Sequence, residues 1–585
     1  MPAIGRRRWS RTGLLCSILA LAAAGACRRS SLLPRADGAA VVVAAAPSPA
    51  DQGVAFVAEV EPNDTLAAAQ KLAFPEAPAE SPALGVNGRL DATAGKARDV
   101  DLFRLAFAPA AGDAAATALR RRLSVEVTPD ATLAVTVDAL DDQGQALIDA
   151  AGGAAGEADG FPNLSVGSGV YFVRVRAASG TSGAYRLVAR LSSLEAGEEQ
   201  EPNGKAALAS EAPAGGELVG YHGWRHDQDW YRVPLAAAPD GSVLAVDLEA
   251  VPGVAASLLI FDAAERKLLE SRGRTEERVA VRNLRPPPGD PQLFVVVRTD
   301  AGRNAAVRYD LRLRFEVPKA GGELEPNDDP AHAQAIGDGD TLGFLGRGDV
   351  DVYRYTPPPG PSELDIELAP PERVDAKLEV IRDIESGTLR GFPGPPATDS
   401  ARAKPELRPR EMVLFRADAG RRHESERIPN LYSPGGGAFL IRLSAGKSDG
   451  NPDEPYRLTI ASRPAPPGAE REPNGTAASA TPLPPGVVGN GLLYPRGDVD
   501  FWRVPAAPAG SATITVTGVA GLVLDVRVQA NDERELGRFK VAGPTPTPFQ
   551  VATGGAGCCL IQIRDASAKS AAPNPIDRYA LAVGP

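Results

Sequence analysis

One acidic motif occurs four times along this chain of 585 residues, and it constrains the fold more than any other feature. Each copy reads Glu-x-Glu-Pro-Asn and is followed further along by Asp-x-Asp-x-aromatic-Arg. The second glutamates of the four copies, Glu61, Glu201, Glu325 and Glu472, lie 140, 124 and 147 residues apart. These spacings are the size of whole domains and far exceed the roughly 20 to 50 residues of a solenoid repeat. The sequence therefore predicts four copies of one module, each with its own core.

The positions of the motif also set the expected domain boundaries. We predict β-sandwich modules at 55–192, 193–317, 318–464 and 465–585, preceded by a signal peptide at 1–26 and a flexible tether at 27–54. The third module holds an insertion at about 385–436 that is rich in Arg, Pro and Gly. We expect this insertion to be a long loop without strands of its own.

Composition and hydrophobic periodicity favour an all-β fold. The 61 glycines and 54 prolines suit many short strands joined by turns. Every module contains runs that alternate apolar and polar residues, such as Leu123–Val127 and Leu364–Leu368, as is typical of strands with one buried face. About eight such strands in each module predict tandem jelly-roll-like antiparallel β-sandwiches. We expect each module to close with a β-hairpin, which in the first joins Val170–Val175 to Tyr185–Val188.

The charge balance bears on possible partners. The formal net charge is −11, and residues 1–26 contain four arginines and no acid, so the chain without them carries −15. An acidic chain without a basic block is a poor binder of nucleic acid and is better suited to holding cations. No nucleic-acid partner is expected.

The N-terminal residues resemble a bacterial lipoprotein signal. Arginines at 6, 7, 8 and 11 precede an apolar run at 14–26 that is too short for a membrane span of about 20 residues. Ala24-Gly25-Ala26-Cys27 resembles a lipobox, in which Cys27 would be acylated and become the new N-terminus. The alternative is an ordinary cleaved signal with an incidental cysteine. The lipobox implies a lipid anchor in the bacterial cell envelope, and Arg28 and Arg29 after the cysteine favour the outer membrane by family resemblance.

The remaining cysteines offer no disulfide framework. Cys558 and Cys559 are neighbours in an expected strand, so their side chains would point to opposite faces and a bridge between them would be strained. We expect one to pack as a small apolar residue and the other to lie at the surface.

The repeated acids suggest a metal site. On an extended segment Glu59, Glu61 and Asn63 share one face, and Asp99 and Asp101 share a face of their strand. If the two segments pair, oxygen-bearing side chains converge, and carboxylates so close together repel unless a cation neutralises them. Ligands that are all oxygen, without His or Cys, favour calcium over zinc.

A purely structural role for the same residues is the alternative. Asn63 or Asp64 could cap the short Ala-rich turn that follows, and Asp-x-Asp could be a solvated strand entry. The second module has Gln228 where the other copies have Val, so its site is the one expected to be altered.

Taken together, the two-part motif resembles the bacterial pre-peptidase C-terminal domain family, which includes the collagen-binding domains of clostridial-type collagenases. The resemblance covers all four modules and implies a jelly-roll-like β-sandwich. In the collagen-binding relatives, acids of the linker and of the strand entry hold calcium, whereas no collagen-binding face can be matched here. Carried over residue by residue, the implied calcium ligands are Glu59, Glu61, Asn63 and Asp101; Glu199, Glu201, Asn203 and Asp229; Glu323, Glu325, Asn327 and Asp351; and Glu470, Glu472, Asn474 and Asp500.

The sequence favours a non-enzymatic role. No Gly-x-Ser-x-Gly or His-Glu-x-x-His motif is present. The preferred interpretation is an envelope lipoprotein presenting four calcium-stabilised modules that bind or adhere to a polysaccharide or protein ligand. A structural or assembly partner of a secreted peptidase is the first alternative, because family members usually accompany peptidases. A cryptic hydrolase that uses His222, His226 and nearby aspartates is the second.

Overall fold

The computed structural model describes residues 54–74, 82–91, 99–108, 120–149, 152–178, 181–195, 197–213, 215–382, 412–418, 420, 422–446, 449–495, 497–505, 510–530, 532–554, 558–567 and 574–584. Within these ranges the chain is all-β, with a single 3-10 turn and no α-helix. No helix in this part of the chain is long and apolar enough to cross a membrane. The predicted signal peptide, the tether and Cys27 lie outside the described residues.

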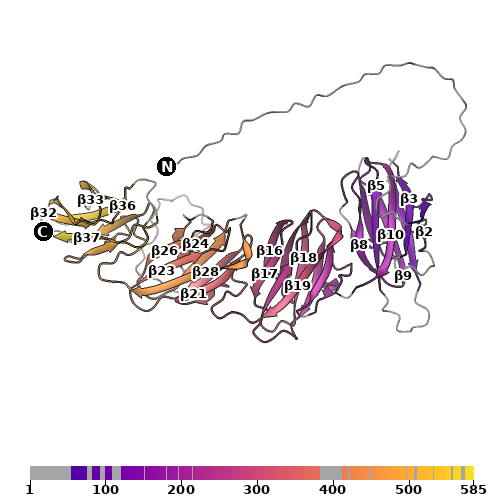
Figure 1. Cartoon of the computed structure of the whole chain (residues 1–585), viewed down its shortest axis with the longest axis horizontal. Coiled ribbons are helices and arrows are strands. Elements are labelled where there is room, and N and C mark those ends of the chain that lie inside the picture. The colour runs from indigo at the N-terminus through magenta and orange to yellow at the C-terminus, as the bar shows by residue number, and fades with distance from the viewer. Residues whose placement is uncertain are drawn as a thin grey trace, which may run out of the picture. The chain divides into compact units, whose positions relative to one another are not determined.

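The first module consists of two facing sheets (Figure 1). One has the order β1-β3-β10-β5-β8 and the other β2-β4-β9-β6-β7. The strands are β1 (Phe56–Ala58), β2 (Gln70–Leu72), β3 (Ala83–Leu90), β4 (Val100–Phe107), β5 (Arg121–Pro129), β6 (Val135–Leu140), β7 (Ala146–Asp149), β8 (Asp159–Val166), β9 (Gly169–Ala177) and β10 (Gly183–Ser193).

The second module repeats this plan with the orders β12-β19-β14-β17 and β11-β13-β18-β15-β16. Its elements are the 3-10 turn η3 (Ala206–Leu208), β11 (Ser210–Glu211), β12 (Glu217–His222), β13 (Gln228–Pro234), β14 (Val243–Leu248), β15 (Ala255–Phe261), β16 (Lys267–Thr275), β17 (Val279–Leu284), β18 (Gln292–Ala301) and β19 (Asn304–Glu316). The turn η3 lies in the Ala-rich stretch that follows the Glu-Pro-Asn motif of this module.

The third module has the orders β21-β28-β23-β26 and β20-β22-β27-β24-β25. Its strands are β20 (Gln334–Ile336), β21 (Gly339–Leu345), β22 (Val350–Tyr355), β23 (Ser362–Ala369), β24 (Ala376–Arg382), β25 (Met412–Ala417), β26 (Glu426–Ser433), β27 (Phe439–Ala445) and β28 (Asn451–Pro464). Strands β25 and β26 lie inside the segment predicted to be a loop, 385–436, and each completes the edge of a sheet. That prediction is therefore too wide, because neither strand shows a clear two-residue alternation in the sequence.

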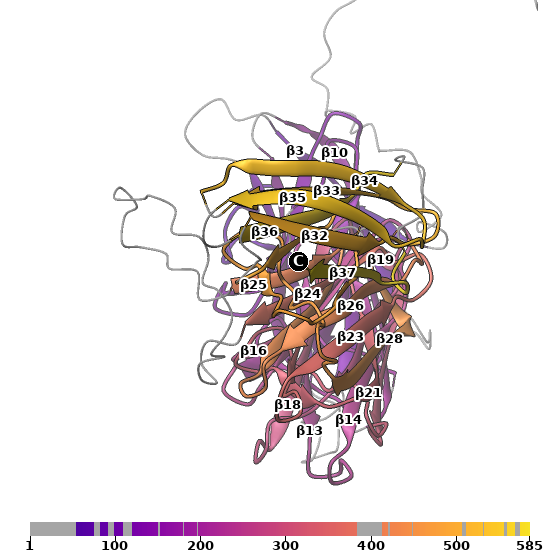
Figure 2. The same ribbon diagram turned by 90° about the vertical axis from the view of Figure 1, so that its left-hand side faces the viewer.

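The fourth module has the orders β30-β37-β32-β35 and β29-β31-β36-β33-β34 (Figure 2). Its strands are β29 (Thr481–Pro482), β30 (Gly489–Gly491), β31 (Val499–Arg503), β32 (Gly510–Thr517), β33 (Val523–Ala530), β34 (Glu535–Ala542), β35 (Thr547–Gly554), β36 (Cys558–Asp565) and β37 (Tyr579–Gly584). Cys559 packs in the core as predicted, but it is also disulfide-bonded, so the expectation of an unbridged cysteine is wrong.

The strand order confirms the jelly roll. When the short edge strands β1, β2, β11, β20 and β29 are set aside and the other eight of each module are numbered in sequence, one sheet has the order first-eighth-third-sixth and the other second-seventh-fourth-fifth. The predicted closing hairpin is wrong, because β9 pairs with β4 and β6 whereas β10 pairs with β3 and β5 in the opposite sheet. Alternation shows that each strand buries one face, but it does not reveal which strand lies beside it.

The core of each module lies between its two sheets. In β5, Leu123, Val125 and Val127 are buried while Ser124 and Glu126 point away, as the period of two requires. Each buried Val or Leu contributes about 1.5–3 kcal/mol relative to an exposed one. Each module has its own cluster of this kind, so the acidic motifs are attached to four separate cores.

Candidate metal centres

In every module the Glu-Pro-Asn segment is hydrogen-bonded to both sheets. The N–H of the first glutamate donates to a carbonyl of the strand that opens one sheet, as Glu199 does to Val219 (2.9 Å) in β12. The carbonyl of the asparagine accepts from the strand that carries the second aspartate, as Asn327 does from Val352 (2.9 Å) in β22. The segment therefore bridges the two sheets and holds its side chains at the open edge between them.

This placement brings three carboxylates together in each copy. One oxygen from each of two glutamates and one aspartate lies within 4.8 Å of the others. The four groups are Glu59, Glu61 and Asp101; Glu199, Glu201 and Asp229; Glu323, Glu325 and Asp351; and Glu470, Glu472 and Asp500. The predicted convergence of acids from two segments is thus present in all four modules.

Backbone donors fix the glutamates in the same way each time. The first glutamate accepts, at 2.6 to 2.9 Å, the N–H of a residue on the first strand of the eight or, in the fourth module, directly after it; these donors are Arg89, Tyr221, Phe344 and Leu492. The second glutamate accepts the N–H of the asparagine two residues later, at 2.7 to 2.8 Å. The intervening Glu–Pro peptide bond is cis in every copy. The carboxylates are thus held in position before any ligand arrives.

The asparagines are fully buried, with 0% exposure in all four modules. Several oxygens in and around the clusters are buried without a hydrogen-bond partner. They include the Oδ1 atoms of Asn63, Asp101, Asn203, Asp229, Asn327, Asn474 and Asp500 and one carboxylate oxygen each of Glu201, Glu323, Glu470 and Glu472. Buried polar atoms without partners are rare in folded proteins, so such a concentration of acceptors indicates a missing donor or cation.

A buried tyrosine completes each cluster, and sequence reasoning missed it. The hydroxyl of Tyr185 donates to Asp101 (2.5 Å), that of Tyr309 to Asp229 (2.7 Å), and that of Tyr579 to Asp500 (2.6 Å). In the third module, the counterpart Tyr456 is fully buried and its hydroxyl is hydrogen-bonded to that of Tyr353. The available signal was the recurrence of tyrosine in the last strand of every copy.

A glycine makes room for this tyrosine. A Cβ added at Gly88, Gly220, Gly343 or Gly491 would lie 2.2 to 2.4 Å from a tyrosine hydroxyl or ring atom. Only glycine therefore lets the opening strand approach the hydroxyl this closely. Glycine, tyrosine and aspartate recur together as one packing unit.

Burial and mutual repulsion raise the pKa values of the clustered acids. Burial first, and then the neighbouring Asp498, raises the pKa of Glu470 to about 8. Burial and Glu199 raise the pKa of Glu201 to about 8. The pKa values of Asp229 and Asp500 are shifted well upward by burial and by the surrounding glutamates. Without a cation these sites favour protonated carboxyls.

The first aspartate of each Asp-x-Asp pair belongs to the same electrostatic group. Burial first, and then Asp349, raises the pKa of Glu325. Burial, Glu201 and Glu199 raise the pKa of Asp227 in the second module. In the third module Asp328 joins them, with burial and Asp349 raising its pKa to about 6. These residues are not among the ligands implied by the family resemblance, although Asp99 was expected to share a face with Asp101.

The second module has Gln228 where the other copies have Val, but this difference does not disturb the second cluster. Its side chain is exposed on β13, while Asp229 points inward and is 1% exposed. Period-two alternation explains this, because residues 228 and 229 face opposite sides of the strand.

The two histidines considered for a hydrolase lie in different surroundings. His222 is 1% exposed, its Nδ1 lies 2.8 Å from Thr299 Oγ1, and burial lowers its pKa to about 4. His226 is exposed and has a φ of 63°. Across the described ranges, neither histidine belongs to any of the four groups whose geometry suits a metal.

The donor set fits a hard divalent cation. Two glutamates, one aspartate and one asparagine offer oxygen only, and a cation with a preference for six to eight oxygens would neutralise the repulsion. Fold and site together define a class: a protein of tandem jelly-roll β-sandwiches, each carrying one cluster of acids that is suited to calcium.

No family model matches the sequence, and no curated protein matches it. Among solved structures, the CUB1-EGF-CUB2 region of human MASP-1/3 is similar at 8% identity with a TM-score of 0.13, over 42% of this chain and 99% of that one. The BSP domain of a biofilm-associated protein is similar at 10% identity with a TM-score of 0.10, over 77% and 91%. At TM-scores this low, neither similarity assigns a family or a function to this chain.

Proposed function

We propose that this chain is a non-enzymatic, lipid-anchored protein of the bacterial cell envelope that presents four calcium-stabilised modules for binding or adhesion. The observation that carries the calcium part is the fourfold recurrence of one cluster, with buried oxygens that lack partners. A cluster kept only for packing has no reason to retain three mutually repelling carboxylates in every copy. Calcium supplies the positive charge that each copy lacks.

The resemblance to the pre-peptidase C-terminal family supports this assignment. In its support, the Glu and Asp residues among the implied ligands are those whose carboxylate oxygens lie within 4.8 Å of one another in each module. The lipid anchor rests on the lipobox-like segment that ends at Cys27. The binding role rests on repetition, because four similar modules in one chain can engage a repetitive ligand with an avidity well above that of a single contact.

Calcium titration of the full mature chain tests the first part. We expect four bound ions and a thermal transition that rises with calcium and falls with chelator. A ligand present at 100 times its dissociation constant stabilises a site by about 2.7 kcal/mol. Magnesium at the same concentration is the control, because it tolerates multidentate protein cages poorly. Melting curves that are identical in calcium and in chelator would contradict the assignment.

The binding part needs a separate experiment. Immobilised polysaccharides and matrix or envelope proteins are screened with the protein in calcium and in chelator. Calcium-dependent retention on one class of surface supports adhesion, and its absence from all of them counts against it.

Association with a secreted peptidase is the second candidate, because members of the family that the motif resembles usually accompany peptidases. Purification from native membranes, with and without calcium, tests it. Recovery of a stoichiometric peptidase would favour this candidate over adhesion.

A further inference from the structure

The acidic clusters of the second, third and fourth modules touch the module before them through the backbone. The second glutamate of each motif forms a parallel β-bridge with a leucine of the preceding module, in the pairs Leu164–Glu201, Leu284–Glu325 and Leu431–Glu472. The N–H groups of Ser165, Arg285 and Tyr432 donate to the glutamate carbonyls at 2.9, 2.8 and 3.2 Å. The motif thus forms an isolated β-bridge on the edge of β8, β17 or β26.

Each of these three edge strands has a β-bulge next to that bridge. The register shifts between Leu123 and Val125, between Leu244 and Val246, and between Leu364 and Ile366 of the partner strands. The extra residues include Asn163, Asn283 and Asn430. The corresponding strand of the fourth module, β35, has no such shift there, and Gln550 pairs regularly with Thr513. A bulge re-aims side chains at functional edges.

Two of the bulge asparagines reach into the next cluster. Nδ2 of Asn163 donates to Oε1 of Glu199, and Nδ2 of Asn430 donates to Oε1 of Glu470. Both asparagines are at most 1% exposed, and neither Oδ1 has a hydrogen-bond partner. Oε1 of Glu470 also accepts the N–H of Leu492, while Oε2 has no partner. In Glu470 one carboxylate oxygen is therefore held and the other is left for an ion, whereas Oε2 of Glu199 faces the hydroxyls of Tyr231 and Tyr309.

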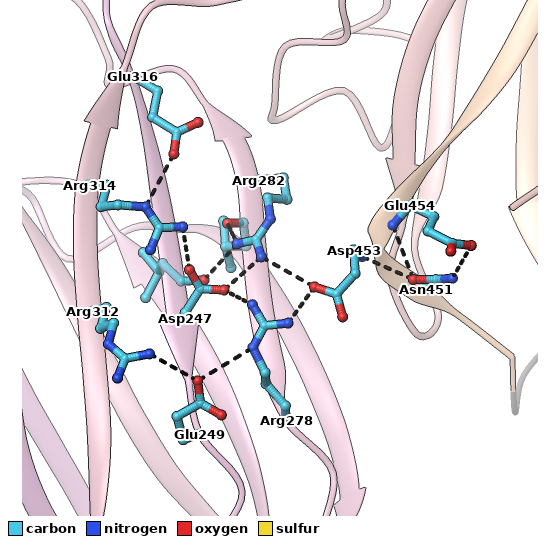
Figure 3. Close-up of polar contacts among 12 residues, drawn as sticks. Asp247, Glu249, Arg278, Arg282, Arg312, Arg314, Glu316, Asn451, Asp453 and Glu454 are labelled. Carbon is cyan, nitrogen blue, oxygen red and sulfur yellow. Dashed lines mark hydrogen bonds and ion pairs between the residues drawn. The ribbon is translucent and has the colours of Figure 1, made fainter. Parts of the chain in front are cut away.

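The junction between the second and third modules shares one backbone contact with the first junction: the carbonyl of Asn283 accepts the N–H of Glu325 at 3.0 Å, as that of Asn163 accepts the N–H of Glu201 at 3.3 Å. Its side-chain contacts are different. Asp453, in the third module, accepts hydrogen bonds from Arg278 and Arg282 of the second module (Figure 3). The same two arginines also donate to Asp247. Arg347 adds a pair of hydrogen bonds to Glu277 at 2.7 and 2.8 Å.

Contact with the preceding module coincides with burial of the cluster. All three carboxylates are buried in the second, third and fourth clusters. In the first cluster, which no described sandwich precedes, Glu61 is exposed and Glu59 is half-buried. Among the described residues, one candidate site is therefore open and three lie at module junctions.

We propose that the second, third and fourth ion sites are completed by the preceding module, so that binding of a divalent cation fixes the orientation of each module on the next. Asn163 and Asn430 are positioning residues that orient the first glutamate toward the ion. This inference rests on the proposed calcium binding. It assigns the ions a second role, as locks between neighbouring modules.

Hydrogen exchange of the full mature chain, with calcium and with chelator, tests the lock. Peptides that contain the junction amides of Ser165, Arg285 and Tyr432 should exchange more slowly in calcium. Peptides around Gln550 in β35, which face no following cluster among the described residues, should not change. Titration on the same samples counts the bound ions.

Matched variants test the asparagines. Asn163→Leu should weaken one of the junction sites about 10- to 100-fold, as loss of a group that orients a metal ligand usually does. It should also speed exchange at Ser165 but not at Tyr432. Asn430→Leu should do the reverse, so each variant controls for the other. Gln550→Leu should leave all sites and all junctions unchanged.

The outcomes separate the two proposals. If no calcium binds, the proposed function fails and the lock fails with it. If four ions bind but junction exchange is the same with and without them, only the lock is overturned. The wild-type comparison decides this even if a variant does not fold. The shared site is established if calcium binds, if it slows exchange at the junctions, and if each asparagine variant loses that protection at its own junction.

Discussion

Tyr579 donates a 2.6 Å hydrogen bond from its hydroxyl to Oδ2 of Asp500, and both side chains are fully buried. The other oxygen of the aspartate, Oδ1, has no partner. The tyrosine itself receives a hydrogen bond from Trp502 Nε1 at 2.7 Å. A chain of buried donors thus fixes the last acid of the cluster and leaves one of its oxygens available.

Replacing this tyrosine should weaken the fourth site without removing a ligand. Tyr579→Phe keeps the ring but deletes the hydroxyl, so Asp500 loses its buried donor. We expect about a tenfold loss of calcium affinity at one site and a destabilisation of about 1–3 kcal/mol. Calorimetric titration and denaturant unfolding measure the two effects. Tyr355→Phe, which loses a 2.7 Å hydroxyl hydrogen bond to Asp338 outside the four clusters, is the control and should leave calcium affinity unchanged.

Neutralising one carboxylate should have opposite effects with and without calcium. Asp500→Asn removes a negative charge from a cluster whose members raise one another's pKa values. In chelator we expect the variant to be more stable than wild type by about 1.4 kcal/mol or more, the equivalent of one pKa unit. In calcium it should be less stable, because a charged ligand is lost. Asp532→Asn, at an exposed position, should be neutral in both. The same sign in both conditions would argue against a metal.

The stability of the calcium-free protein should fall as the pH rises. The clustered acids have folded pKa values above their unfolded ones, so above about pH 4.5 the unfolded chain releases protons that the folded chain retains. The contribution of these acids to stability is therefore full below that pH and is lost progressively toward about pH 8, the folded pKa of Glu470 and Glu201. Melting temperatures in chelator from pH 5 to 8 measure the slope. Saturating calcium should abolish or reverse it, because binding requires ionised carboxylates. An unchanged slope in calcium would contradict the assignment.

Filling the space beside the cluster tyrosine should destabilise the third module. A Cβ at Gly343 would lie 2.3 Å from the Tyr456 hydroxyl and 2.6 Å from an oxygen of Glu323. We expect Gly343→Ala to cost about 1–3 kcal/mol, as overpacking usually does. Gly337→Ala, where nothing lies within 4 Å of the added atom, is the matched control. Calorimetry of the full chain would show one transition lowered by the first variant and none by the second.

Much of the fold could be predicted because it depends on local periodicity. The runs at Leu123–Val127 and Leu364–Leu368 bury alternate residues as expected, and the four repeats correspond to four jelly-roll β-sandwiches. The sequence predicts the strands β9 and β10, but the predicted pairing between them is wrong. Each pairs with strands that are distant in the sequence, and a local pattern does not specify these partners. The edge strands β25 and β26 were missed for a related reason: their place in the sheets comes from pairing with β24 and β23.

The sequence by itself determined that acids recur at fixed places in four similar modules, because repetition and spacing are properties of a linear chain. Only the tertiary structure decided what surrounds them. Tyr579 lies 79 residues from Asp500, and Asn430 lies 40 residues from Glu470 in the preceding module. Contacts of the first kind form when two sheets pack on each other over a core. Contacts of the second kind form when the edge strand of one module forms a β-bridge with the motif of the next. No local pattern specifies these events, because the groups that meet are brought together only by packing.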